Sequence, residues 1–225
     1  MNHYCIQPIS DDGLLIQFSA ETNLELLPHI HSLTDHLLEQ DIVGIKDIVP
    51  AFDSIAIFYD PIQYSYHDLV LELKPMLQFT NQQQQREPNL LQIPVCYDTS
   101  LGLDIEEVAK QHSLTVDEVI DIHSNATYTV AIMGFLPGFP YITGLPEQLW
   151  TARKSTPRTY VPKGAVGIGG TYTGIYSLPS PGGWNIIGQT PLTLFNHKKD
   201  HPFLLQPGDR VSFTPITKTE FERFL

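Results

Sequence analysis

The sequence predicts an α+β domain at the N-terminus, followed by a second, mainly-β domain. Apolar runs with strand and helix periodicity alternate over residues 4–77. A polar segment at residues 80–89, which contains four consecutive glutamines, then interrupts this pattern and is the best linker candidate. Beyond it, many short strands and dense Gly/Pro turns favour a closed barrel or a sandwich over βαβ units. We therefore expect domains at residues 1–88 and 89–225.

The first domain begins with two short strands and a helix. Residues 4–9 and 14–18 have β-type patterns on either side of a turn. The next apolar residues fall on one face at the helical period, and they are Leu26, Ile30, Leu33 and Leu37. Two starts of this helix are open, because Thr22 and Glu25 form a capping box whereas Pro28 suits a first turn.

Two more strands and a second helix complete this domain. Residues 45–49 and 54–59 read as a strand pair around Pro50. Ser65 and Asp68 cap the helix that follows. Its apolar stripe consists of Leu69, Val70, Leu73 and Leu77. The order strand-strand-helix-strand-strand-helix suits helices that pack against one face of a single sheet.

The second domain starts with a strand and two short helices. Residues 90–96 read as a strand, in which Pro94 favours an edge position because proline lacks an N–H donor. Asp104 and Thr115 are the expected helix caps, and Thr115 forms a capping box with Glu118. The expected helices cover residues 104–112 and 115–123. The other expected strands cover residues 127–133, 192–195, 203–205 and 211–215.

The composition excludes several classes of partner. The chain has 13 Lys and Arg against 25 Asp and Glu, and its net charge of −12 argues against nucleic acid, whose phosphates it would repel. The sequence has neither an apolar run long enough to span a membrane nor a secretory signal, so we expect no membrane association. Cys5 and Cys96 have no CxxC partner, which fits buried thiols in a reducing cytoplasm.

Residues 134–191 form a basic, loop-dense segment in this acidic chain. The segment holds eleven of the 15 glycines and eight of the 18 prolines. Its basic residues are Arg153, Lys154, Arg158 and Lys163, against Glu147 alone. These cations beside glycine loops point to an anionic ligand, a carboxylate or a phosphate, with ordinary solvated surface as the alternative.

Common catalytic and nucleotide-binding motifs are absent. The sequence contains no GxxxxGK[ST], GxSxG, HExxH or CxxC. Lys163 precedes a run of glycines ending at Gly170, which is a weak indication of phosphate binding. His29 and His31 point in different directions on a helix, so a shared metal is not expected.

His123 and the segment from Ser180 to Trp184 are the remaining candidates. His123 ends a helical segment, where a cation is favoured. It also precedes the strand that leads into the Gly/Pro segment, and in the alternative interpretation it acts there as a general acid or base. Ser180 begins the sequence SPGGW, in which two glycines expose backbone N–H groups and Trp184 could form an apolar wall. A tight turn with a core tryptophan is the alternative for this segment.

Three segments together resemble one known family. They read GFLPGFPYITGLP from Gly134, TPRTYVPKGAVGIGGTYTGIYSLPSPGGWNIIGQTP from Thr156, and LLQPGDRVSFTPI from Leu204. They are similar to the bacterial family of 5-oxoprolinase B subunits, which includes KipI-type histidine-kinase inhibitors and allophanate-hydrolase subunit 1 proteins. The family domain is a carboxyltransferase-like domain, subdomain C and D. The resemblance implies a cyclophilin-like β-barrel behind the small N-terminal α/β domain.

The resemblance also implies partners, cofactors and site residues. With a homologous larger partner, the C subunit, the chain would activate 5-oxo-L-proline with ATP and Mg²⁺, and the A subunit would complete hydrolysis to L-glutamate.

The family pattern of a histidine, a tyrosine and a GFxPGF loop falls on His123, Tyr128, Gly134, Phe135, Pro137, Gly138 and Phe139. Its PR, VPxG and SPGGW elements fall on Pro157, Arg158, Val161, Pro162, Gly164, Ser180, Pro181, Gly182, Gly183 and Trp184. With His123 as the candidate catalytic residue, the candidates for binding substrate or an anion are Phe139, Arg158, Lys163, Ser180, Gly182, Gly183, Trp184, Gln189 and Thr190.

The sequence departs from the family pattern at Gln189, where relatives often have arginine. A neutral amide cannot replace the charged, bidentate fork of that side chain. Many relatives also read Pro-Arg-Arg where this chain has Ala152, Arg153 and Lys154.

Two functions follow from the resemblance: an enzyme subunit that is inactive alone, and a regulator that binds a sporulation-type histidine kinase. A prolyl isomerase would rest on the barrel shape alone, and a fold does not establish a function.

Overall fold

The computed structural model describes residues 4–18, 26–78 and 88–224, and the chain divides into two compact units between Glu87 and Pro88. Each unit buries an apolar core of its own. Most of the predicted linker, residues 80–89, lies outside the described residues.

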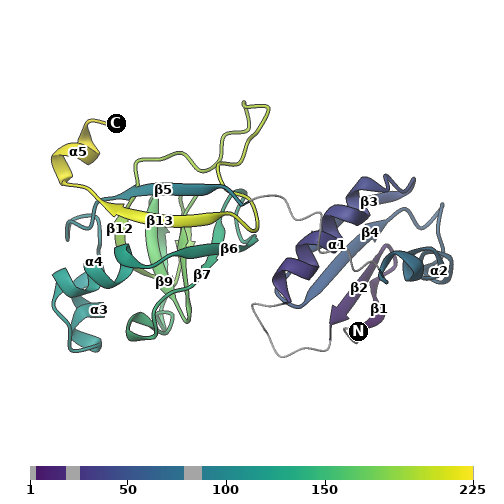
Figure 1. The fold of residues 1–225 in the computed structure, drawn as a ribbon, viewed down its shortest axis with the longest axis horizontal. Coiled ribbons are helices and arrows are strands. Elements are labelled where there is room, and N and C mark those ends of the chain that lie inside the picture. The colour runs from purple at the N-terminus through teal and green to yellow at the C-terminus, as the bar shows by residue number, and fades with distance from the viewer. Residues whose placement is uncertain (1–3, 19–25, 79–87, 225) are drawn as a thin grey trace. The chain divides into compact units, whose positions relative to one another are not determined.

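Unit 1 is an antiparallel four-stranded sheet with two helices. Its strands lie in the spatial order β1-β2-β4-β3, and α1 lies along one face of the sheet (Figure 1). The elements are β1 (Tyr4–Ser10), β2 (Gly13–Phe18), α1 (Leu27–Glu39), β3 (Ile45–Pro50), β4 (Ser54–Tyr59) and α2 (Tyr66–Met76). Among the buried core residues are Ile16, Ile30, Leu33, Ile57 and Leu73. The predicted order of strands and helices is confirmed in this unit.

The helix starts in unit 1 follow from local chemistry. Pro28 lies in the first turn of α1, where its missing N–H costs nothing, so this alternative for the helix start is confirmed. The capping box of Thr22 and Glu25 lies outside the described residues. The Ser65 side chain accepts a hydrogen bond from the Asp68 N–H at 3.2 Å, as predicted for the cap of α2.

Unit 2 is built around a mixed, nearly closed seven-stranded sheet that resembles a barrel. Its strand order is β12-β9-β10-β7-β6-β13-β5. The elements up to β6 are β5 (Leu90–Val95), α3 (Ile105–Gln111), α4 (Val116–Asn125) and β6 (Tyr128–Met133). Those that follow are β7 (Pro140–Thr143), β8 (Arg158–Val161), β9 (Ala165–Gly169), β10 (Tyr172–Ile175), β11 (Ser180–Gly182), β12 (Asn185–Gln189), β13 (Arg210–Pro215) and α5 (Lys218–Glu222). A closer likeness to cyclophilin stays a prediction.

One residue pair closes the sheet of unit 2. The backbone N–H groups of Cys96 and Gln189 donate to each other's carbonyl oxygens at 2.9 Å, and these bonds join the end of β5 to the end of β12. Within the seven-stranded order β5 is an edge strand that pairs only with β13, so the edge position predicted from Pro94 is confirmed. Helices α3 and α4 pack together beside the sheet (Figure 1).

The Gly/Pro segment at residues 134–191 is richer in strands than its composition predicts. It contains β7 to β12, including the small two-stranded sheet of β8 and β11. The predicted strands at 192–195 and 203–205 are wrong, because only a single bridge joins Phe195 to Phe203. The sequence patterns above do not predict helix α5, although Thr217 and Glu220 form its capping box.

Candidate functional site

A cluster of aromatic side chains lies within the Gly/Pro segment. It consists of Phe139, Tyr141, Tyr176 and Trp184, and we call it the aromatic cluster. The ring of Phe139 lies 5.4 Å from that of Trp184 and 5.2 Å from that of Tyr176, in both cases nearly perpendicular. The rings of Tyr141 and Trp184 are 5.7 Å apart. Edge-to-face packing of this kind is favourable and fixes each ring in place. Two predicted site residues, Phe139 and Trp184, therefore meet here, and both are almost fully buried.

Three glycines make room for the indole of Trp184. A Cβ atom at Gly169 would lie 2.7 Å from the indole ring, and one at Gly174 would lie 2.9 Å from it. At Gly167 the nearest Trp184 atom would be 3.2 Å away. Gly167 and Gly169 lie two residues apart on β9 and therefore on one face of the sheet. Gly174, on the neighbouring strand β10, pairs with Gly167. The glycines act here as a flat platform for a side chain rather than as a phosphate-binding loop.

Gly182 has a similar packing role. A Cβ atom at this position would overlap the hydroxyl group of Tyr176. Gly182 is buried in β11 and pairs with Arg158 of β8. The neighbouring Gly183 accepts a hydrogen bond from the Lys154 N–H at 2.7 Å. Ser180 begins β11, and its hydroxyl donates to the Pro181 carbonyl at 3.0 Å.

Arg153 brings a positive charge to the aromatic cluster. Its guanidinium carbon lies 5.6 Å from the centre of the Trp184 ring, within the range of a cation–π interaction. Burial raises the pKa of Tyr176, and the nearby charges of Arg153 and Arg158 act against this rise. Arg153 is exposed, and within the described part of the chain no carboxylate forms an ion pair with it. Arg153 is therefore a cation that faces solvent over a rigid aromatic floor.

Arg158, in contrast, is held by a buried carboxylate. Its two terminal nitrogens donate to the two oxygens of Asp104 at 2.7 and 2.6 Å. Lys154 Nζ donates to the same carboxylate at 3.0 Å, and the Ile186 N–H donates to it at 2.7 Å. The Asp104 N–H in turn donates to the Ile186 carbonyl at 2.7 Å. Asp104 thus ties the start of α3 to β8 and β12.

The environment of Asp104 keeps this carboxyl group charged. Burial alone would raise its pKa, but hydrogen bonds from Arg158 and from the Ile186 N–H, with a further one from Lys154, hold the pKa below its ordinary value. Asp104 is the N-cap residue of α3, as predicted, but its side chain makes no capping hydrogen bond, because its oxygens accept from these donors instead. Arg158 accordingly has a structural partner already, and its predicted role in anion binding stays a prediction.

Lys163, Gln189 and Thr190 lie together near the closure of the sheet. Lys163 is exposed and its Nζ donates to the hydroxyl of Thr193 at 2.9 Å. The side-chain amide of Gln189 donates to the Lys163 carbonyl at 2.7 Å. The Thr190 N–H donates to the Gly164 carbonyl at 2.9 Å, and Thr190 is buried. The side-chain amide of Gln189 therefore fixes the turn before β9.

His123 lies in the core of unit 2, fully buried. Its Nδ1 is 2.7 Å from the hydroxyl of Tyr97, and its Nε2 is 3.1 Å from the hydroxyl of Thr173. The Thr173 hydroxyl donates to the Gly167 carbonyl, so it accepts from the imidazole, which therefore carries its proton on Nε2. Both ring nitrogens are thus used within the core. This geometry argues against the predicted general acid or base, since neither nitrogen faces solvent.

Burial lowers the pKa of His123 to about 3, from 6.5. In the unfolded chain this histidine binds a proton near pH 6.5, whereas in the folded chain it binds one only near pH 3. The free energy of unfolding therefore has its full value above pH 6.5 and decreases as the pH falls through this window. We expect this residue to contribute a loss of about 1.4 kcal/mol per pH unit between pH 6.5 and about pH 3. Urea unfolding between about pH 7 and about pH 5, above most carboxylate titrations, would measure the slope.

His123→Gln should flatten this slope, because glutamine can accept from Tyr97 and donate to Thr173 without titrating. His197→Gln, at an exposed position, is the matched control and should keep the wild-type slope. An unchanged slope in His123→Gln would show that the imidazole is accessible to protons in the folded chain.

Part of the glycine run after Lys163 is not available to bind a phosphate. Gly167 and Gly169 lie in strand β9, which pairs with β10 and with β12, so their backbone groups are used within the sheet. In the ranges the structure describes, no three His, Cys, Asp or Glu side chains are grouped to hold a metal ion.

None of the described helices is long and apolar enough to cross a membrane.

These features define a class of protein: a mixed α/β chain whose barrel-like sheet carries an arginine over a buried aromatic floor. More specifically, the chain belongs to the family of the carboxyltransferase domain, subdomain C and D, whose model matches residues 4–205. The predicted resemblance to the family of 5-oxoprolinase B subunits is confirmed.

Three relatives illustrate this membership. The chain is 36% identical to the 5-oxoprolinase B subunit of Bacillus subtilis, over 98% of this chain and 96% of that protein. It is 38% identical to the 5-oxoprolinase B subunit of Haemophilus influenzae, over 92% of this chain and 96% of that protein. The crystal structure of TTHA0988 superposes with a TM-score of 0.80 at 35% identity and covers 94% of this chain. The chain spans only 40% of the TTHA0988 chain.

Proposed function

We propose that this chain is the B subunit of an ATP-dependent 5-oxoprolinase complex. Identity of 36–38% over nearly the full length of proteins with this name is the observation that carries the proposal. The chain would act in the cytoplasm with the larger C subunit to phosphorylate 5-oxo-L-proline, and the A subunit would complete hydrolysis to L-glutamate.

The chemistry explains why such a chain would need a partner. The lactam carbonyl of 5-oxoproline is a poor electrophile because of amide resonance, and phosphorylation of its oxygen by ATP would make it reactive. We assign ATP and Mg²⁺ to the larger subunit, because Gly167 and Gly169 of this chain are used within the sheet and do not form a phosphate-binding loop.

In this proposal, the chain's own contribution is to bind and orient the substrate. Arg153 would pair with the substrate carboxylate, since a guanidinium and a carboxylate form strong, directional hydrogen bonds. The rigid platform under Trp184 would hold Arg153 in position. No acid–base step is assigned to His123, which has no access to solvent in this structure.

Reconstitution of the complex tests the proposal. We expect 5-oxoproline-dependent ADP release and L-glutamate formation when this chain is combined with the larger C subunit and the A subunit, and neither activity when this chain or the larger subunit is omitted. Turnover by the isolated chain would contradict the proposed division of labour. Absence of turnover in the full mixture, together with loss of histidine-kinase autophosphorylation on adding the chain, would instead favour the KipI-type regulator.

A further inference from the structure

Unit 2 exposes an apolar surface between two loops. Phe135, in the turn between β6 and β7, is 59% exposed, and Phe203 and Leu204 are 44% and 37% exposed. The two loops adjoin at Gly138, where a Cβ atom would lie 2.8 Å from the Cβ of Phe195 and 3.5 Å from the ring of Phe203. Large apolar side chains that are exposed on adjoining loops commonly mark a binding site.

The conformation of Phe135 supports a role for this surface. Its φ of 63° lies in the left-handed region, where a bulky side chain is rarely found outside functional or strained sites. The ring does not become buried in exchange for this strain. It contacts the aromatic cluster only by its edge, at 5.4 Å from Phe139 and 6.3 Å from Tyr176. The structure therefore presents Phe135 outward at an energetic cost.

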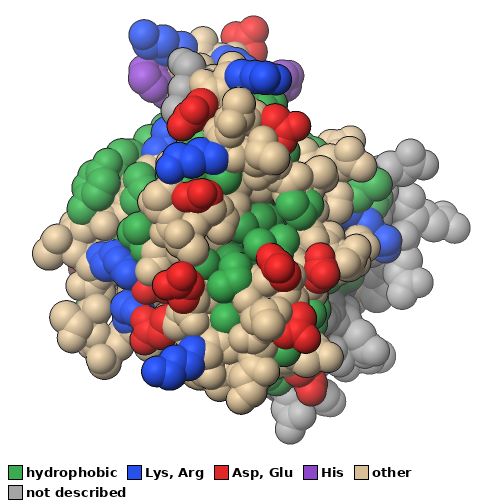
Figure 2. Space-filling model, turned by 90° about the vertical axis from the view of Figure 1, so that its left-hand side faces the viewer, with side chains coloured by type: hydrophobic (Ala, Val, Ile, Leu, Met, Phe, Trp, Pro, Cys, Tyr) green, Lys and Arg blue, Asp and Glu red, His purple; other side chains and the backbone are tan. Residues whose placement is uncertain are grey.

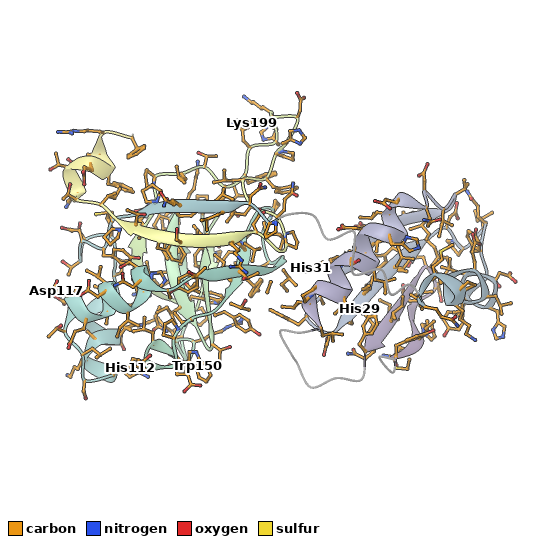
Figure 3. The ribbon with its side chains drawn as sticks, viewed as in Figure 1. His29, His31, His112, Asp117, Trp150 and Lys199 are labelled. Carbon is orange, nitrogen blue, oxygen red and sulfur yellow. The ribbon has the colours of Figure 1, made fainter. Side chains whose placement is uncertain are left out.

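A short basic loop rises from the same surface. Its base is formed by Phe195 and Phe203, whose rings stack 5.3 Å apart, and by a hydrogen bond from the Asn196 N–H to the Pro202 carbonyl. The tip carries two lysines and two histidines against one aspartate; these are His197, Lys198, Lys199, Asp200 and His201. All five are exposed. Figure 3 labels Lys199 at the far end of the loop, and Figure 2 shows Lys and His side chains gathered at the top of the molecule.

We propose that Phe135, Phe203 and Leu204, with the basic tip at 197–201, form a docking surface for an apolar segment flanked by acidic side chains on the larger subunit. The apolar residues would provide the contact area, while the tip would attract acidic groups to a chain that is otherwise strongly acidic, with a net charge of −12. The identity of the partner rests on the proposed function.

The docking surface lies close to the aromatic cluster and to Arg153. Phe135 touches Phe139 and Tyr176, and Phe139 contacts Trp184, on which Arg153 lies. A partner seated on Phe135 would therefore border the aromatic cluster and exclude water from its edge. The same contact would bring the partner's ATP close to a substrate held by Arg153.

Binding of the larger subunit to variants of the full chain, measured by isothermal titration, tests this surface. Phe135→Ser should weaken binding about tenfold or more, at low and at physiological ionic strength, as expected of an interface anchor. The double variant Lys198→Glu with Lys199→Glu should weaken binding at least as much at low ionic strength, and should lose the salt dependence of the wild type.

Matched controls separate this surface from general effects. Leu103→Ser is the control for Phe135→Ser, because it changes a side chain that is 50% exposed elsewhere on unit 2. Lys110→Glu with Arg223→Glu is the control for the lysine variant, because it makes the same change in net charge at exposed positions. Both controls should bind the larger subunit as the wild type does. Unchanged unfolding midpoints would show that the variants fold. Wild-type affinity in the surface variants would overturn the docking surface but leave the proposed function standing. Absence of binding by the wild type, or preferential binding of its basic tip to RNA or anionic vesicles, would overturn the partner assignment.

Discussion

Replacement of Asp104 by alanine should lower the free energy of unfolding by about 2–4 kcal/mol. The substitution removes the acceptor for Arg158 and for the Ile186 N–H at once, and it leaves Lys154 paired with Glu107. The Ile186 N–H is left without a partner in the core, and the guanidinium loses its bidentate contact. The loss stays below that of a fully buried ion pair because the side chains of Arg158 and Lys154 are 26% and 22% exposed. Urea unfolding at neutral pH would measure it.

An exposed ion pair in the same unit provides the control for Asp104. Asp98 lies 3.7 Å from Lys218 with 39% of its side chain exposed. Asp98→Ala should therefore lower the free energy of unfolding much less than Asp104→Ala does, as is usual for surface pairs. A double-mutant cycle of Asp104→Ala with Arg158→Met would isolate the coupling between the two side chains. A loss for Asp104→Ala no larger than that for Asp98→Ala would refute the structural role of this carboxylate.

Replacement of Arg153 by glutamine should raise the KM of the assembled complex for 5-oxoproline about 10- to 100-fold. Glutamine keeps much of the side-chain length but loses the charge that would pair with the substrate carboxylate. The value of kcat should change little, because the carboxylate is bound similarly in the ground state and in the transition state. The KM of Arg153→Lys should lie between the values of the wild type and of Arg153→Gln. Arg223 is an exposed arginine at the end of α5, and Arg223→Gln should have the KM of the wild type.

The sequence predicts those parts of the fold that local chemistry decides. The helix faces of α1 and α2 follow from apolar residues at helical spacing, and the caps at Ser65 and Thr115 use side chains a few residues away. The strands of the Gly/Pro segment are different. Glycine carries no side chain to show alternation, so Gly167 and Gly169 read as loop until the indole that they accommodate is known. That indole belongs to Trp184, outside any local window around β9.

The same limit applies to the candidate site. Composition and residue pattern single out the segment at 134–191 with Phe139 and Trp184 in it, and the structure places these two side chains against each other. The sequence suggests only a local capping role for Asp104, because nothing near it reveals an ion pair with Arg158, 54 residues away. The position of His123 before a strand suggests a place beside a pocket, whereas its burial depends on Tyr97 and Thr173 from distant segments.

In the proposed complex, Arg153, held over Trp184, recognises the carboxylate of the substrate. Equilibrium binding of 5-oxoproline to the complex of this chain with the larger subunit, measured by isothermal titration for the wild type and for Arg153→Gln, tests it most directly. We expect the variant complex to bind 5-oxoproline at least about tenfold more weakly, and both complexes to bind the neutral lactam 2-pyrrolidinone equally. Equal affinity of the two complexes for 5-oxoproline would contradict it.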